Sequence, residues 1–302
     1  MKYVQPRLTM TAMLVAMNIA GGGYAAAQTA TAPLATYQSG VERVVASDQL
    51  RMLSQQISAS ACLVDAGVSA DTNKEIIANG LSEFDRILTA LRDGDAEQGI
   101  ATAEENRKML AAIRGLSLQW DRLKIAAEDR VAGRTSDELV DYLSRQNINT
   151  MHAAKYLVIE AVNTYAIPPA LLQTDAFTIN ILVRQRTLSH QISKELCGIA
   201  SGNETMGNQA RLRNAIRLFD ASLLALRDGF PAAGVSAPQS EASRDTLSSM
   251  TVSWAELKAE IEQAATQTDI VLVATLVGRL TDMQVSLDDL VTIYTQESKN
   301  GL

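Results

Sequence analysis

The sequence predicts an all-α protein built as two tandem antiparallel four-helix bundles after a cleaved signal peptide. Three observations lead to this prediction. The composition favours helices, since 47% of the residues are hydrophobic, 4% are aromatic and only six are proline. One block of sequence recurs at a fixed spacing, without the alternating pattern of β-strands. The first residues also have the polarity of an export signal.

The recurring block has two parts, and both recur 135 residues further along the chain. The stretch "RMLSQQISASAC" begins at Arg51 and "RTLSHQISKELC" begins at Arg186, with seven of twelve positions identical. The stretch "FDRILTALRDG" begins at Phe84 and "FDASLLALRDG" at Phe219, with eight of eleven identical. Because the spacing is the same for both parts, we interpret them as one internal repeat.

Residues 1–27 are predicted to be a signal peptide that is removed on export. Lys2 and Arg7 precede a short apolar run, and three alanines at 25–27 suit cleavage. The alternative is an uncleaved membrane anchor, but a run of about 13 apolar residues is shorter than the roughly 20 that cross a bilayer. We expect no later stretch to span a membrane.

The first bundle is expected over residues 28–166 and the second over 171–302. Ser136 is a plausible N-cap, and Gly94 and its repeat Gly229 are expected to end helices in the αL conformation. In the second bundle the longest loop is expected at 230–238. The four helices of the first bundle are predicted at 37–64, 73–92, 96–130 and 136–165.

The prolines at 168 and 169 separate the two bundles, because proline does not continue a helix undisturbed. An up-down-up-down bundle returns the chain to the end where it began. The first helix of the second bundle can therefore lie beside the first helix of the first bundle and run parallel to it. A kinked end-to-end array is the alternative.

The repeated stretch places small polar residues on one face of each first helix. Helical spacing aligns Arg51 with Ser54, Gln55, Ser58 and Cys62, and Arg186 with Ser189, His190, Ser193 and Cys197. A solvated face is one interpretation. A seam between helices is favoured, because the pattern recurs position by position and serine is a mediocre helix former that suits close packing.

Parallel packing of the two first helices would bring Arg51 and Arg186 towards each other. Two facing guanidinium groups repel unless an anion lies between them. A planar oxyanion accepts fork hydrogen bonds from both guanidinium groups. The hydroxyls of Ser54 and Ser189 are expected to be supplementary donors.

These residues resemble a known family. "RMLSQQ" from Arg51 and, more fully, "INILVRQRTLSHQ" from Ile179 resemble the signature of PilJ-type domains, the N-terminal ligand-binding region of type IV pili methyl-accepting chemotaxis transducers. The signature is also similar to the P-box helix of periplasmic nitrate and nitrite sensor kinases. The resemblance implies a periplasmic four-helix bundle in which the arginine of the motif holds nitrate between two first helices of a dimer. Here that role would fall on Arg51 and Arg186.

The two repeats depart from this signature to different extents. Asp48 lies three residues before Arg51 and is expected to pair with it, in competition with an anion. The second repeat has Val183 at the equivalent position, with Arg184 and His190 close by. We therefore expect Arg186 to contribute more to anion affinity than Arg51.

Cys62 and Cys197 are the only two cysteines and occupy equivalent positions. In an exported protein they can form a disulfide across a parallel helix pair, or they can remain separate buried thiols. The sequence leaves both alternatives open. His152 and His190 have no partners at zinc-ligand spacing, so we predict no metal and no cofactor.

Most other features indicate structure rather than chemistry. Trp120 and Trp254 are interpreted as packing residues, and acidic pairs such as Asp288-Asp289 as solvated helix charges. The chain has no nucleophile elbow, P-loop, dinucleotide fingerprint or HExxH motif, so we do not expect an enzyme. A net charge of −7 excludes a basic surface for nucleic acid.

Two functional hypotheses follow. The first is a soluble periplasmic sensor or binding protein for a small oxyanion of the nitrate class, which signals through a membrane sensor or a chemotaxis transducer. The second is a ligand-free helical adaptor or structural protein that docks to a transducer, a sensor kinase or a pilus-related assembly. A homodimer is possible in either case.

Overall fold

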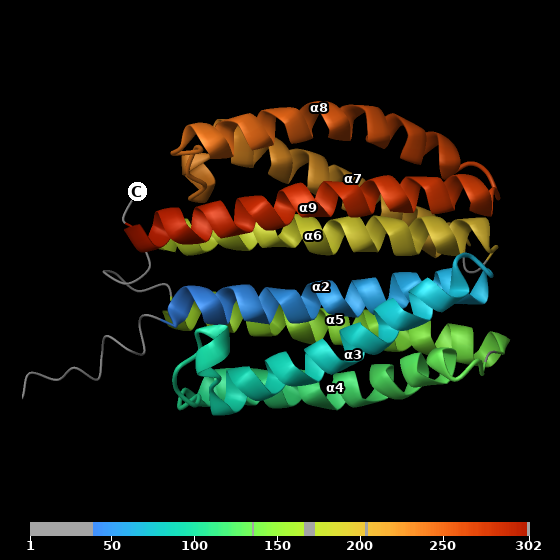
Figure 1. The fold of residues 1–302 in the computed structure, drawn as a ribbon, viewed down its shortest axis with the longest axis horizontal. Coiled ribbons are helices and arrows are strands. Elements are labelled where there is room, and N and C mark those ends of the chain that lie inside the picture. The colour runs from blue at the N-terminus through green and yellow to red at the C-terminus, as the bar shows by residue number, and fades with distance from the viewer. Residues whose placement is uncertain (1–38, 135, 166–172, 203–204, 301–302) are drawn as a thin grey trace, which may run out of the picture. The chain divides into compact units, whose positions relative to one another are not determined.

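The computed structural model describes residues 39–134, 136–165, 173–202 and 205–300 of the chain (Figure 1). Eight α-helices occupy almost all of this part, in which strand pairing is limited to two isolated bridges. In chain order the helices are α2 (Gly40–Asp65), α3 (Ala70–Asp93), α4 (Arg107–Val131), α5 (Asp137–Tyr165), α6 (Gln173–Ala200), α7 (Thr205–Asp228), α8 (Glu241–Ala264) and α9 (Ile270–Asn300).

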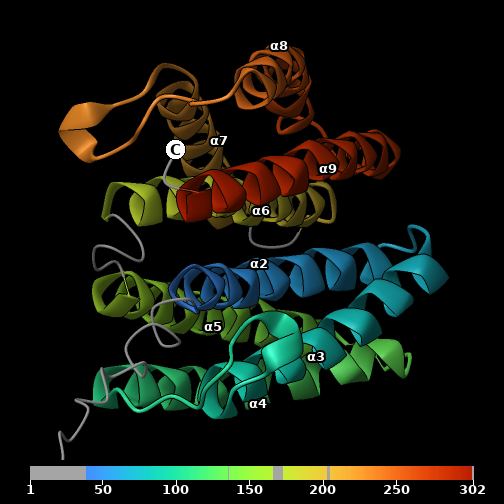
Figure 2. The same ribbon diagram turned by 60° about the vertical axis from the view of Figure 1, so that its left-hand side comes forward.

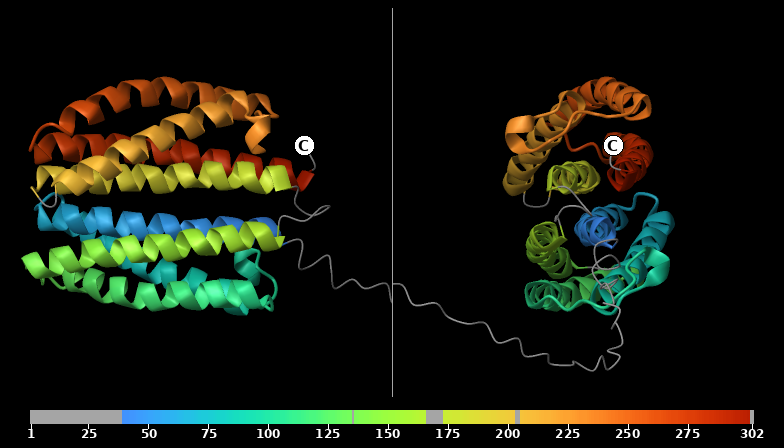
Figure 3. Two further views of the ribbon diagram at one scale, coloured as in Figure 1. Left: turned by 180° about the vertical axis from the view of Figure 1, so that it is seen from behind. Right: turned by 90° about the vertical axis from the view of Figure 1, so that its left-hand side faces the viewer.

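The helices form two sets of four, α2–α5 and α6–α9, as the end-on view of Figure 3 shows. Within each set every helix packs against the next, and the fourth helix returns to the first. This closed order is that of an up-down-up-down bundle, so the predicted all-α fold with two tandem bundles is confirmed. The predicted signal peptide (1–27) and the proline-containing connection (167–170) lie outside the described residues.

The two bundles meet through their first helices. α2 and α6 run parallel and side by side (Figures 1 and 2). Cys62 and Cys197 form a disulfide with a Cα–Cα distance of 6.2 Å, which holds the equivalent positions of the two repeats together. Lys194 Nζ of α6 also donates a hydrogen bond to Asn147 Oδ1 of α5, at 2.9 Å. The prediction of side-by-side packing is confirmed, and the cysteines are bridged.

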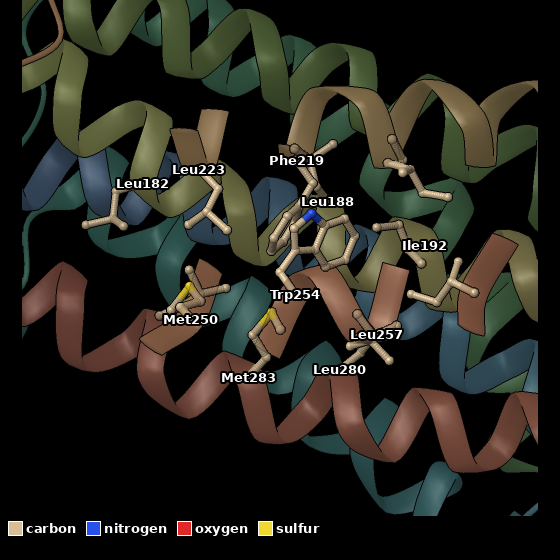
Figure 4. Close-up of a cluster of buried hydrophobic side chains, with 14 of the residues drawn as sticks. Leu182, Leu188, Ile192, Phe219, Leu223, Met250, Trp254, Leu257, Leu280 and Met283 are labelled. Carbon is tan, nitrogen blue, oxygen red and sulfur yellow. The ribbon is translucent and has the colours of Figure 1, made fainter. Parts of the chain in front are cut away.

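Each bundle has its own hydrophobic core around one tryptophan. Trp120 and Trp254 are 1% and 2% exposed, which confirms that they are packing residues. Trp120 stacks on Phe84 with ring centroids 3.7 Å apart. Trp254 lies against Phe219 at 4.1 Å, between leucines of the second bundle (Figure 4). Both phenylalanines come from the repeated "FD" stretch, so the repeat encodes the core as well as the seam.

The predicted third helix begins later than expected. It starts at Arg107 rather than at residue 96, because Asn106 caps it by accepting hydrogen bonds from the backbone N–H groups of Lys108 and Met109. The predicted N-cap Ser136 accepts a hydrogen bond from the backbone N–H of Leu139, at 3.3 Å, and is confirmed.

The residues between α3 and α4 leave the bundle in an irregular excursion. Gly94 ends α3 with φ 86° and ψ 152°, so its φ is positive as expected but its ψ lies outside the αL region. A 3₁₀ turn at Ala96–Gln98 and a bridge between Asp95 and Ile100 follow. The second bundle repeats this excursion with a 3₁₀ turn at Pro231–Ala233. The expected helix start at 96 was therefore wrong, and both repeats share the excursion.

One described helix is long and apolar enough to cross a membrane when judged by length and composition alone. It is the stretch Ile270–Glu297 of α9. The expectation that no stretch after the predicted signal peptide has this property was therefore wrong. In the structure one side of α9 packs along α6, where Leu276 and Leu280 are fully buried.

Candidate functional site

The repeated polar stripe is buried, and its two cysteines join α2 to α6 at the seam between the bundles. On α2, Ser54 and Ser58 are 0% and 2% exposed, and on α6, Ser189 and Ser193 are 0% and 3% exposed. The interpretation as a solvated face is therefore wrong, and the interpretation as a helix–helix seam is confirmed. Small side chains at these positions let the two helices approach closely enough for the disulfide one to two turns further on.

Arg51 forms an ion pair inside this seam. Its Nη2 contacts Oδ1 of Asp48, one helical turn earlier, and the two side chains are 7% and 1% exposed. The expected pairing of these residues is confirmed. The Nε of Arg51 is buried without a hydrogen-bond partner among the described residues. Burial of a charged donor without an acceptor costs free energy, so this guanidinium group is incompletely neutralised.

Arg186 lies nearer to the surface and pairs with a different helix. Its Nε is 2.8 Å from Asp288 Oδ1 of α9, with the two side chains 16% and 56% exposed. Asp288 is an exposed residue of α9, as interpreted, and it also forms this ion pair. Nothing in the local sequence indicates the contact, because it joins residues on two different helices of the bundle.

The charges of three arginines, from both repeats, influence the pKa of one buried carboxyl group. Burial raises the pKa of Asp48, and the positive charges of Arg51, Arg186 and Arg184 oppose that rise. Burial and the nearby charge of Arg51 lower the pKa of Arg184. Arg51 and Arg186 thus pair with different carboxylates, and their convergence on one anion stays a prediction.

The two serine hydroxyls that were expected to assist an anion donate to backbone carbonyl groups. Ser54 Oγ donates to the carbonyl of Arg51 at 2.7 Å. Ser189 Oγ donates to the carbonyl of Leu280 at 3.4 Å and accepts from Gln284 Nε2 at 3.1 Å. In this conformation neither hydroxyl proton points to a shared anion position.

His190 is held uncharged in the seam. Burial, with a smaller contribution from the charge of Arg186, lowers its pKa from 6.5 to about 3. A neutral imidazole both donates and accepts a hydrogen bond, so His190 adds no positive charge to the arginines at neutral pH.

This burial predicts that the protein loses stability in acid through His190. The unfolded chain protonates the imidazole near pH 6.5 and the folded chain only near pH 3. The unfolded state therefore binds more protons between these values, and the free energy of unfolding falls as the pH drops, by up to about 5 kcal/mol in total. Urea unfolding at several pH values measures this slope. We expect His190→Gln to remove it and His152→Gln, at an exposed position, to retain it.

Glutamine residues at the seam were not predicted as site residues. Gln185, next to Arg184 and Arg186, is 0% exposed, and both polar atoms of its side chain lack a partner in the described part of the chain. Gln55 Oε1 of α2 is also buried without a partner. Unsatisfied buried amides are rare in folded proteins, so they mark a place where a further polar group would be stabilising. Gln185 lies within the signature stretch that begins at Ile179. This position was the sequence feature that could have identified it as a site residue.

Comparison with known families gives one result for both repeats. The family model of PilJ, described as "Type IV pili methyl-accepting chemotaxis transducer N-term", matches residues 35–145 and 171–280. Each match contains one copy of the Arg-Ser stripe, and together they cover well over half of the chain. A search of curated proteins found no match.

Proposed function

Because the chain belongs to the PilJ family, and is thus a helical protein related to chemotaxis transducers, we propose that it is a periplasmic sensor of a small oxyanion of the nitrate class. The ligand would bind among the arginines at the seam of α2 and α6. The single observation that carries this proposal is that the equivalent arginines of the two repeats, Arg51 and Arg186, each bind a carboxylate, Asp48 and Asp288.

The charge balance of the seam supports an anionic ligand. Three arginines face two carboxylates, Asp48 and Asp288, while His190 is neutral. The unpartnered Nε of Arg51 and amide of Gln185 provide donors that the protein itself leaves unused. A planar oxyanion accepts several hydrogen bonds in one plane, which suits guanidinium forks. The resemblance of the stripe to the P-box of nitrate and nitrite sensor kinases selects the nitrate class.

The exposure of the two ion pairs supports an order of binding. The Arg186–Asp288 pair has a carboxylate that is 56% exposed, whereas the Arg51–Asp48 pair is almost fully buried. An exposed ion pair contributes little to stability and is readily exchanged for another anion. An oxyanion would therefore reach Arg186 first, in agreement with the expectation that Arg186 contributes more than Arg51.

Export and signalling complete the proposal. The predicted signal peptide and the Cys62–Cys197 disulfide both suit an oxidising compartment such as the periplasm. The proposed anion position would be lined by both repeats of one chain, so binding would not require a homodimer. Ligand exchange at a seam between two bundles would alter their packing, and a membrane sensor or chemotaxis transducer would read that change.

The proposal predicts saturable binding of nitrate that depends on Arg186. Thermal unfolding and calorimetric titration with nitrate, nitrite, sulfate, phosphate and chloride at constant ionic strength measure it. We expect a planar oxyanion to raise the unfolding temperature, and Arg186→Ala to weaken binding by about tenfold or more, since a hydrogen bond to a charged group contributes about 1.5–3 kcal/mol. Arg227→Ala, at an exposed ion pair of adjacent residues, is the matched control. No response of the wild-type protein to any of these anions would exclude the proposal.

A ligand-free adaptor is the second candidate function. It is favoured by the finding that Arg51 and Arg186 already have carboxylate partners and that a disulfide fixes the seam. Such a protein would dock to a transducer, a sensor kinase or a pilus-related assembly through an outer helix face. Co-purification of a membrane partner with the wild-type chain and with the Arg51→Ala, Arg186→Ala double variant separates the two candidates. Equal recovery from both, without any oxyanion response, favours the adaptor.

A further inference from the structure

An arginine closes one end of the first bundle. Arg43 of α2 is 1% exposed, and its guanidinium group donates to the carbonyl of Leu91 at 3.1 Å, to Glu104 Oε2 at 3.1 Å and to the carbonyl of Thr102 at 2.5 Å. The same group lies over the ring of Tyr165, 5.3 Å from its centroid. Two carbonyl groups, a carboxylate and an aromatic face therefore form a cage around one guanidinium.

The second bundle has the same backbone here but lacks the arginine. Thr178 stands 135 residues after Arg43, and Gln239 stands in the same way after Glu104. The bridge between Phe230 and Val235 repeats that between Asp95 and Ile100. Ala237 stands 135 residues after Thr102. The backbone around the cage is thus repeated, while the arginine and the carboxylate at the position of Glu104 are not.

A cavity of about 40 Å³ lies at this place, lined by Asp175, Thr178, Ser236, Gln239, Tyr294 and Glu297, together with aliphatic atoms. One water needs about 10–15 Å³ in this measure, so the space corresponds to roughly three waters. A guanidinium group, with its four heavy atoms, is of similar size.

Two side chains of α9 have unsatisfied polar atoms at this cavity. Glu297 is 8% exposed, and both of its carboxylate oxygens are buried without a hydrogen-bond partner among the described residues. The hydroxyl of Tyr294 is also buried and unpartnered. Burial, together with the charge of Glu297, raises the pKa of Tyr294, so this ring stays neutral. A buried carboxylate without donors is costly, and a cation with several N–H groups would remove that cost.

We propose that this cavity binds the guanidinium head of a small cationic solute, in the position that the Arg43 side chain fills in the first bundle. Glu297 supplies the carboxylate that Glu104 supplies there, and Tyr294 supplies the aromatic ring that Tyr165 supplies. This proposal does not depend on oxyanion binding at the seam.

Calorimetric titration with methylguanidinium chloride, matched to sodium chloride in ionic strength, tests the proposal on the whole mature chain. We expect saturable binding of one equivalent. Glu297→Gln keeps the shape of the side chain but removes its charge, and is expected to weaken binding by about tenfold or more. Glu256→Gln, an exposed residue of α8, is the charge-matched control and should bind as the wild type does.

Thr178→Arg is a second and independent variant, since it restores the residue of the first bundle at this position. We expect it to raise the unfolding temperature and to abolish methylguanidinium binding, because its own side chain fills the cavity. Methylammonium lacks the planar fork of donors and is expected to bind about fivefold more weakly than methylguanidinium. Absence of saturable methylguanidinium binding by the wild type, unchanged binding by Glu297→Gln, or equal affinity for methylammonium would each overturn the assignment. A nitrate titration on the same samples reports separately on the seam.

Discussion

Replacing both Cys62 and Cys197 with serine is expected to lower the free energy of unfolding by about 5 kcal/mol. The disulfide joins residues 135 apart in the sequence and therefore closes a long loop in the unfolded chain. A cross-link across a loop of about this length restricts the unfolded ensemble by about 5 kcal/mol in the chain-entropy treatment. Urea unfolding of the wild type and the double variant measures the difference.

Reductant provides the control for this prediction. The two residues are the only cysteines of the chain, so dithiothreitol should bring the wild type to the stability of the double variant and should leave that variant unchanged. A loss below about 1 kcal/mol would contradict the prediction, because it would mean that the disulfide does not restrict the unfolded chain.

Asp48→Asn is expected to lower the free energy of unfolding by about 3 kcal/mol or more, because removal of one partner from a buried ion pair leaves the other charge uncompensated. Arg51 then keeps no carboxylate beside it, and the repulsion among Arg51, Arg184 and Arg186 is no longer offset by the buried charge of Asp48. Urea unfolding at neutral pH and low salt measures the loss.

Asp288→Asn is the matched control for Asp48→Asn. It breaks the other arginine pair of the seam, but Asp288 is more than half exposed, and exposed pairs contribute at most about 1 kcal/mol. If the two variants lost the same small amount of stability, Asp48 would not be the buried counter-charge of the three arginines.

The internal repeat made most of the fold predictable. Two blocks with one spacing indicated two equivalent bundles, and the copied polar face indicated that their first helices touch. The disulfide between Cys62 and Cys197 agrees with that arrangement, although the sequence left their pairing open. Equivalent residues of a parallel, in-register helix pair face each other. Matching positions in the two repeats could therefore be expected to lie close together in the structure.

The excursion before α4 shows where local sequence was insufficient. Residues 96–98 are Ala-Glu-Gln, which are good helix formers, so the segment was expected to be helical. In the second repeat Pro231 and Pro238 indicated a loop at the same place. The first excursion is held by Arg43, which lies 59 residues from the Thr102 carbonyl that it binds. A contact between residues so far apart in the chain produces no pattern in the local sequence.

The sequence predicted the charged residues of the site but not all of their ion-pair partners. The recurrence of the arginines and serines was sufficient to place them at a seam, and the spacing of Asp48 from Arg51 was sufficient to predict their pair. The contribution of Asp288 was not predictable, because α9 reaches Arg186 only through the fold of the bundle. The unpartnered side-chain amide of Gln185 was likewise not predictable, because the sequence does not show that this residue is buried.

The measurement that tests the central claim most directly is the nitrate affinity of Asp48→Asn compared with that of the wild type. The claim is that arginines of both repeats bind one anion, and that the Asp48 carboxylate, paired with Arg51, competes for that position. Removal of that competing charge should tighten nitrate binding by about tenfold or more, as expected for a gain of about 1.4 kcal/mol or more. Calorimetric titration of a folded Asp48→Asn protein that showed no nitrate binding, or an affinity no tighter than that of the wild type, would contradict the claim.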